Sequence, residues 1–119
     1  MGYTINMKKQ SLANTKIAIF KGKNIRRIIY HNEWWFSVID VVEALTNSNI
    51  PKRYWSDLKV KLKGEGYSEV YDKIVRLKLL AVDGKIRETD CANTETIFRI
   101  IQSIPSPKAE PFKRWLAKE

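Results

Sequence analysis

The sequence predicts an α+β fold made of small antiparallel strands and hairpins, a helix-turn-helix-like pair of helices, and further helices toward the C-terminal end. Three observations predict it. Isoleucine-rich runs of strand length flank a glycine early in the chain, two amphipathic helical stripes are joined by a polar turn, and an Asp-Gly pair lies between two later apolar runs. A hairpin that follows such a helix pair makes the order of elements winged-helix-like.

One compact domain is expected, because the chain has 119 residues of which 44% are hydrophobic, and this size supports a single core. We expect residues 1–15 to form a flexible polar tail and residues 16–119 to form the domain. Because the chain ends at Glu119 without a polar tail, we expect the domain to be the N-terminal part of a longer protein. The N-terminal residues contain no signal-peptide or membrane-span pattern, and the single cysteine gives neither a disulfide framework nor a Cys-based zinc site.

The first strands are predicted to form an antiparallel meander. Residues 16–20 and 25–30 are separated by a turn at Gly22, and a second turn at Asn32 precedes residues 34–36. Arg26 interrupts the second strand, so that its side chain either adds to a basic surface or belongs to an ordinary solvated strand face.

The first helix of the central pair is predicted to begin after Ser37, which can cap it, with Asp40 in a near capping-box position. Its apolar positions follow helical spacing: Val38, Val41, Val42 and Leu45. The polar run at residues 46–49 ends this helix, because such side chains compete for backbone hydrogen bonds.

The second helix of the pair is predicted to begin at Pro51, because proline fits a first helical turn. One stripe is apolar and consists of Tyr54, Trp55, Leu58 and Leu62. Another stripe is polar and mostly basic and consists of Lys52, Ser56, Lys59 and Lys63. This pattern is typical of a helix that packs on one side and presents charge on the other.

The C-terminal half is predicted to contain a hairpin and two helices. Residues 74–82 and 85–90 flank the Asp-Gly turn, whereas residues 67–73 show no clear periodicity. Asn93 or Thr94 can cap a helix whose stripe consists of Ile97, Ile100, Ile101 and Ile104. Pro105, Pro107 and Pro111 should separate it from a short final helix over residues 112–118.

The charge is distributed unevenly. The net charge is +9, and residues 1–63 hold 12 Lys and Arg against 4 Asp and Glu, whereas residues 64–119 hold 10 against 9. The excess of +8 on the half that carries the helix pair, against +1 on the other half, favours a localised surface for a polyanion such as nucleic acid.

The chain resembles the Bro-N domain of phage antirepressors and of baculovirus repeated-open-reading-frame proteins. The resemblance spans roughly residues 17–119 and rests on WWFSVIDVVEAL, PKRYWSDLKVKL, LLAVDGKIRETD and IQSIPSPKAEPFKRWLA, taken in that order. Within that family it looks most similar to the branch that contains DNA-damage-inducible protein D. The resemblance implies a DNA-binding domain of prophage or mobile-element regulators of transcription, in the cytoplasm and associated with the nucleoid when bound to DNA.

The expected DNA contacts are the outward polar side chains of the second helix, the turn before it, the second strand and the hairpin. They are Lys52, Arg53, Ser56, Lys59, Lys63, Asn49, Arg26, Lys78, Lys85 and Arg87. The plainer alternative is a solvated helix face with an Arg53–Asp57 pair and a solvated hairpin. The turn residue Asn47 is likewise explained by turn chemistry alone.

Other functions were weighed against duplex DNA binding. Trp34 and Trp35 alternate in a strand, so that one of them is a candidate for stacking on single strands, although core packing is favoured for all four tryptophans. Asp40 with Glu43, or a cluster of Asp83, Glu88 and Asp90, would be needed for a metal-dependent nuclease. We expect no enzyme, metal or cofactor.

The remaining alternative is a protein-interaction module that binds a repressor or another acidic partner without contacting DNA, and a homo-oligomer is also left open. An exposed apolar patch among the basic residues would favour the protein partner.

Overall fold

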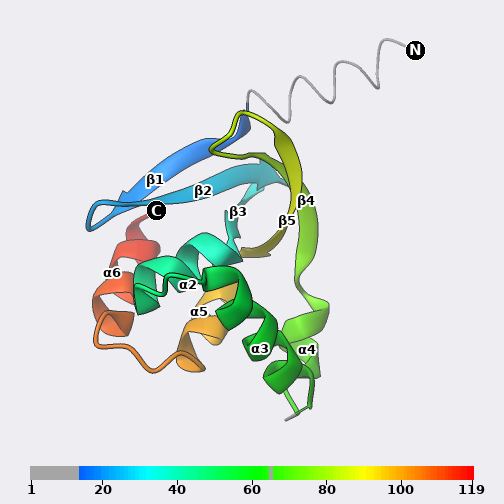
Figure 1. The fold of residues 1–119 in the computed structure, drawn as a ribbon, viewed down its shortest axis with the longest axis vertical. Helices are drawn as coiled ribbons and strands as arrows, with labels where there is room; N and C mark the ends of the chain where they lie inside the picture. The colour runs from blue at the N-terminus through cyan, green and yellow to red at the C-terminus, as the bar shows by residue number, and fades with distance from the viewer. Residues whose placement is uncertain (1–13, 65) are drawn as a thin grey trace.

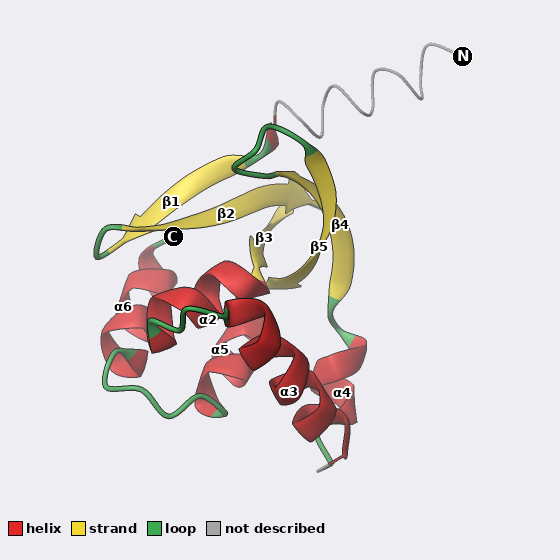
Figure 2. Cartoon of the chain, viewed as in Figure 1, coloured by secondary structure: helices red, strands yellow, loops and turns green. Residues whose placement is uncertain are grey.

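The computed structural model describes residues 14–64 and 66–119 and is α+β, as the sequence predicts. Five antiparallel strands form one open sheet in the order β1-β2-β3-β5-β4. The helices gather on one side of this sheet (Figure 2). Most of the predicted tail, residues 1–13, lies outside the described residues, and Thr15 accepts a hydrogen bond from the Leu80 N–H at 3.3 Å.

The predicted meander is confirmed as β1 (Lys16–Phe20), β2 (Lys23–Tyr30) and β3 (Glu33–Ser37). The turn between β1 and β2 consists of Lys21 and Gly22, and both have positive φ. The hairpin is formed by β4 (Val75–Leu80) and β5 (Ile86–Asn93), and β5 also pairs with β3. The hairpin is therefore part of the single sheet, and Figure 1 shows it at one end of that sheet.

The loop of this hairpin is longer than the Asp-Gly pair. The Ala81 N–H donates to the Lys85 carbonyl at 2.8 Å, and the Gly84 N–H donates to the Ala81 carbonyl at 3.0 Å. These bonds enclose a three-residue loop, residues 82–84, which requires a left-handed residue at its last position. Gly84 takes that conformation with a φ of 82°.

The central helices follow the predicted caps. In α2 (Val38–Thr46) the Ser37 side chain accepts from the Asp40 N–H, and α3 (Pro51–Gly64) begins at the proline. In α5 (Thr94–Gln102) the cap is Asn93, whose side chain accepts from the Thr96 N–H at 3.0 Å.

Two helical features differ from expectation. The helix α6 (Ala109–Lys118) begins three residues before the predicted start at residue 112, with Pro111 inside its first turn, where backbone donors have no partner within the helix. A short helix, α4 (Ser68–Asp72), occupies the segment without periodicity and buries Val70. Five residues are too few to show a helical pattern in the sequence.

Two clusters of buried side chains hold the fold together. The larger lies between the sheet and the helices and includes Phe36, Trp55 and Phe112. The smaller lies on the other face of the sheet and consists of Ile28, Trp35, Leu79 and Cys91. Trp34 packs on the larger cluster and Trp35 belongs to the smaller one, which confirms that these neighbours point to opposite faces.

The larger cluster can be tested at Trp55, whose exposed fraction is 4%. Trp55→Ala should lower the free energy of unfolding by about 3–5 kcal/mol in urea denaturation, because it removes a large buried ring and leaves a cavity. Val60→Ala is the matched control on the same helix, since Val60 is 73% exposed and should change stability very little. Equal losses from the two variants would contradict this account of α3 packing.

Candidate nucleic-acid interface

The turn that precedes α3 is held by its own side chains. Asn47 closes α2 in a left-handed conformation, with a φ of 53°. The Ser48 N–H donates to Thr46 Oγ1 at 3.1 Å, and the Ile50 N–H donates to Ser48 Oγ at 3.1 Å. Turn chemistry therefore accounts for Thr46, Asn47 and Ser48, whereas the exposed side chain of Asn49 makes no such bond within the described residues.

The carboxylate of Asp90 fastens α3 to the sheet. Its Oδ2 accepts from Trp55 Nε1 at 2.8 Å and from Lys59 Nζ at 2.9 Å, and its Oδ1 accepts from Arg76 Nε at 3.4 Å. Burial raises the pKa of Asp90, but the hydrogen bonds from Trp55 and Lys59 outweigh it and hold that pKa below its ordinary value. Lys59, which the sequence places among the DNA contacts, is therefore committed to an internal ion pair.

Arg26 is likewise engaged inside the domain. Its Nε and NH2 donate to the two carboxylate oxygens of Asp40 at 2.8 and 3.0 Å, and NH1 donates to the Leu80 carbonyl at 3.3 Å. The hydrogen bond to Asp40 raises the pKa of Arg26 despite its burial. Asp40 thus joins α2 to β2, and its carboxylate does not complete a capping box.

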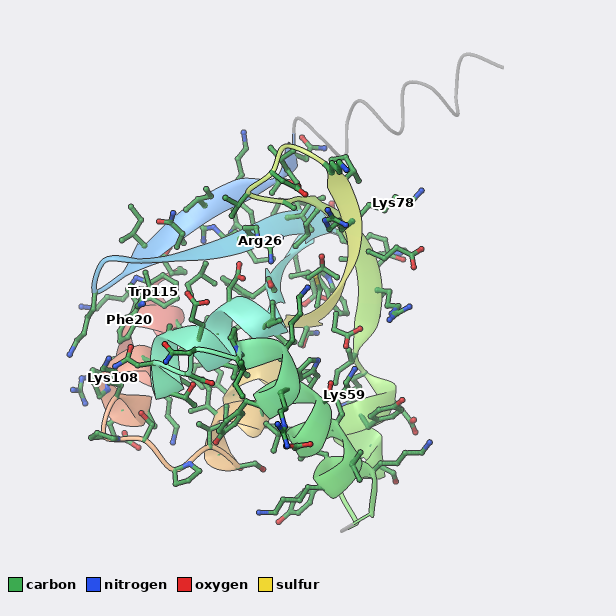
Figure 3. All side chains as sticks on the ribbon, in the orientation of Figure 1. Phe20, Arg26, Lys59, Lys78, Lys108 and Trp115 are labelled. Atoms are coloured by element: carbon green, nitrogen blue, oxygen red, sulfur yellow. The ribbon has the colours of Figure 1, made fainter. Side chains whose placement is uncertain are left out.

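The hairpin divides into paired and unpaired cations. Arg87 forms an ion pair with Asp83, and the hydrogen bond from Arg87 is the main cause that lowers the pKa of Asp83. Lys78 and Lys85 are exposed, and neither side chain has an ion-pair partner among residues 14–64 and 66–119. Figure 3 shows Lys78 on the hairpin and Lys59 on α3.

The outward face of α3 carries the cations that stay available. Lys52, Arg53 and Lys63 are exposed and have no ion pair within the described part of the chain, and the alternative Arg53–Asp57 pair is not formed there. Lys63 Nζ lies 5.4 Å from the centroid of the Tyr71 ring. Ser56 is exposed between these cations. The sequence analysis missed Lys61, an exposed cation of the last turn that helical spacing places on the other flank of α3.

A groove of about 1180 Å³ runs between the strands, the hairpin and the helices α2 and α3. Among the described residues, six basic and five acidic side chains line it. Four of the basic ones are paired with acids, namely Arg26, Lys59, Arg76 and Arg87. Lys23, which the sequence analysis did not select, lines the groove together with Lys52. The groove is therefore nearly balanced in charge, and the excess positive charge lies outside it.

The structure brings the predicted contacts together only in part. Arg26, Lys52, Ser56, Lys59 and Arg87 line this groove. Asn49, Lys52 and Arg53 line a smaller adjoining cleft of about 500 Å³ at the start of α3. Lys63, Lys78 and Lys85 line neither hollow.

The tryptophans pack in or against the interior. Trp35 and Trp55 are 8% and 4% exposed, Trp115 lies against Phe20, and the Arg27 guanidinium lies 4.0 Å from the centroid of the Trp34 ring. The preference for core packing over stacking on single strands is thus supported. Within the described residues there is no cluster of three or more His, Cys, Asp or Glu that could hold a metal, and no helix long and apolar enough to cross a membrane.

Comparison with known proteins gives one match. The family model described as the BRO family, N-terminal domain (Bro-N), matches residues 24–119, which is most of the chain. No curated protein and no solved structure matches the chain significantly.

The Asp90 contact predicts a specific dependence of stability on pH. Because its pKa is lowered in the folded state, the carboxylate stabilises the fold above the pKa of the unfolded chain, about 3.9, and this contribution is lost as the pH falls through the folded value. Asp90→Asn should cost about 1–3 kcal/mol at neutral pH by urea denaturation, with the difference from wild type shrinking below about pH 4.

The matched control for this experiment is Asp72→Asn, because Asp72 is exposed and forms no ion pair with the described residues. A difference between wild type and Asp90→Asn that stays constant from neutral to acid pH would contradict the role given to the Asp90 charge.

Proposed function

We propose that this chain, which belongs to the BRO family through its Bro-N domain, binds duplex DNA through the outward face of α3. The observation that carries the proposal is the set of cations on that face that no acid among residues 14–64 and 66–119 neutralises, Lys52, Arg53 and Lys63. Lys and Arg neutralise backbone phosphates, and a helix has the width to enter the major groove. Asn49 and Ser56 would add hydrogen bonds near the same end of the helix.

The remaining predicted contacts take two different roles in this proposal. Lys78 and Lys85 would reach flanking phosphates from the hairpin, because both are exposed and unpaired within the described residues. Arg26, Lys59 and Arg87 would act indirectly, since each already holds an acid of the same domain. Their ion pairs would hold α3 and the hairpin in position, and their charges would not be available to phosphates.

The biological role we propose is that of a regulator of transcription, either antirepressor-like in a prophage or induced by DNA damage, acting in the cytoplasm at the nucleoid. The resemblance to the branch that contains DNA-damage-inducible protein D supports the second possibility.

A second candidate, binding of a protein such as a repressor, is favoured by apolar side chains beside the same cations. Ile50 is 57% exposed just before α3, and Val60 is 73% exposed within it. A salt series separates the two candidates. Binding of a labelled random duplex that weakens steeply with salt supports DNA, whereas no binding at low salt would remove the DNA function and leave the protein partner.

The α3 face is tested by changing Lys52, Arg53 and Lys63 together to alanine. Each lost phosphate contact should lower the slope of log K against log[salt] by about 0.9, as measured by fluorescence anisotropy. The melting temperature should stay nearly unchanged, because the three side chains are exposed and form no ion pairs in the described structure. Lys59 is left in place because it holds Asp90.

The matched control removes the same charge from α6 and its N-cap residue, by changing Lys108, Arg114 and Lys118 to alanine. All three also lack an ion pair within residues 14–64 and 66–119, and α6 lies on the other side of α2 from α3 (Figure 1). An equal fall in slope for the two triple variants would show that net charge rather than α3 determines binding.

A further inference from the structure

The strand β1 is an open edge of the sheet that exposes apolar side chains. It is the first strand in the sheet order, and within the described residues it pairs only with β2. No helix or strand lies along its outer side in Figure 1. Ile17 and Ile19 are 55% and 62% exposed, whereas Ala18 and Phe20 point to the other face and are buried.

The outward backbone groups belong to the same two residues. The turn formed by Lys21 and Gly22, with φ values of 46° and 80°, is a two-residue turn that closes on the pair Phe20 and Lys23. Such a turn closes on a pair that exchanges both hydrogen bonds, and these pairs alternate along an antiparallel ladder. Phe20 and Ala18 therefore direct their N–H and C=O groups to β2, whereas Ile17 and Ile19 present theirs at the free edge.

Such an edge invites pairing with another strand. Natural proteins protect exposed edges with short strands, lysines, proline, bulges or inward charges. β1 is short and begins with the exposed Lys16, but it pairs with β2 in continuous register, contains no proline, and carries no charge at residues 17–19. The contact between Thr15 and Leu80 lies just before β1, and no strand among residues 14–64 and 66–119 pairs with the outer side of Lys16–Phe20.

We propose that a second copy of this chain pairs with β1, antiparallel and centred on Ala18. In this register Ile17 lies opposite Ile19 of the second copy, and Ile19 lies opposite its Ile17. The two pairs bring together four exposed isoleucines and the outward backbone groups of both strands. The register also suits the charges, because Lys16 lies opposite Phe20 and Lys21 lies opposite Thr15, so that no two lysines face each other.

A second copy fits this edge because Ile17 and Ile19 flank Ala18, so that an antiparallel register centred on Ala18 places isoleucine opposite isoleucine on both sides. The interface is small. A strand pair of five residues buries far less than the roughly 1,200–2,000 Å² of a stable complex, so that the dimer exchanges with monomer. The proposed dimer does not depend on the proposed DNA binding, and the experiments that test it are carried out without DNA.

The register is tested by disulfide trapping between two variants that each add one cysteine, Ile17→Cys and Ile19→Cys, one of them carrying a tag that changes its mass. An equimolar mixture should give the mixed disulfide dimer in several-fold excess over either variant alone, because positions 17 and 19 face each other only between copies. The native Cys91 does not interfere, since it is buried and burial raises its pKa to about 12. Val60→Cys mixed with Ile19→Cys is the control, with an exposed thiol on α3.

Sedimentation of the unmodified chain provides the second measurement. Wild type should show a concentration-dependent dimer below about 1 mM, and Ile17→Lys with Ile19→Lys should be monomeric at the same concentrations, because lysines would then face each other. Val60→Lys should leave the dimer intact. A wild type that stays monomeric would overturn the proposal and leave residues 1–13 or a strand of another protein as the occupant. A dimer that persists in the lysine variant, or trapping without register preference, would overturn it as well.

Discussion

The contact of one carboxylate with three donors determines where the charged helix of this domain lies. Asp90 is on β5 and receives hydrogen bonds from Trp55 and Lys59 of α3 and from Arg76 of β4. The Trp55 ring is also part of the larger core, so that α3 is held both by apolar packing and by a directional bond. Packing alone would allow α3 to rotate or slide by small amounts, whereas the bond to a single partly buried carboxylate selects one orientation. The exposed face of α3 follows from that orientation.

The same contacts decide which cations can act on a partner. The unpaired charge at the strand side of the groove is small because Asp40, Asp83 and Asp90 each hold a basic side chain. Lys52, Arg53 and Lys63 form no ion pair among the described residues, although Lys52 and Lys63 share the helical stripe of Lys59. The chain thus combines an overall charge of +9 with a groove that is nearly balanced in charge. Most of the charge that would attract a polyanion from a distance therefore comes from residues outside the groove.

Local sequence patterns predicted most of this fold, and the misses have physical causes. The sequence predicts Ser37 as one cap and either Asn93 or Thr94 as another, because a cap acts within three residues, and the structure shows Asn93 in that role. The strands are predicted because hydrophobic runs and turns are local signals. The fate of Lys59 could not be predicted in this way, because its partner is 31 residues distant and is brought near only by the sheet. The prediction places the start of α6 too late because it treats Pro111 as a helix break, although proline is tolerated in a first turn.

Weak association of two copies at the β1 edge would increase the DNA affinity that a small set of phosphate contacts in each copy can give. In the proposed function, a single α3 face with three cations that are unpaired in the described structure would bind DNA weakly at physiological salt, because each contact contributes little and is screened. Two copies joined along β1 are related by a two-fold axis and therefore present two α3 helices with opposite direction, which matches the symmetry of an inverted repeat. Binding of the first copy then raises the effective concentration of the second, so that two weak interactions cooperate without any additional contact. Within this proposal, the order in which the strands are arranged is as important for recognition as the basic helix, because β1 at the edge of the sheet fixes how the two helices are presented.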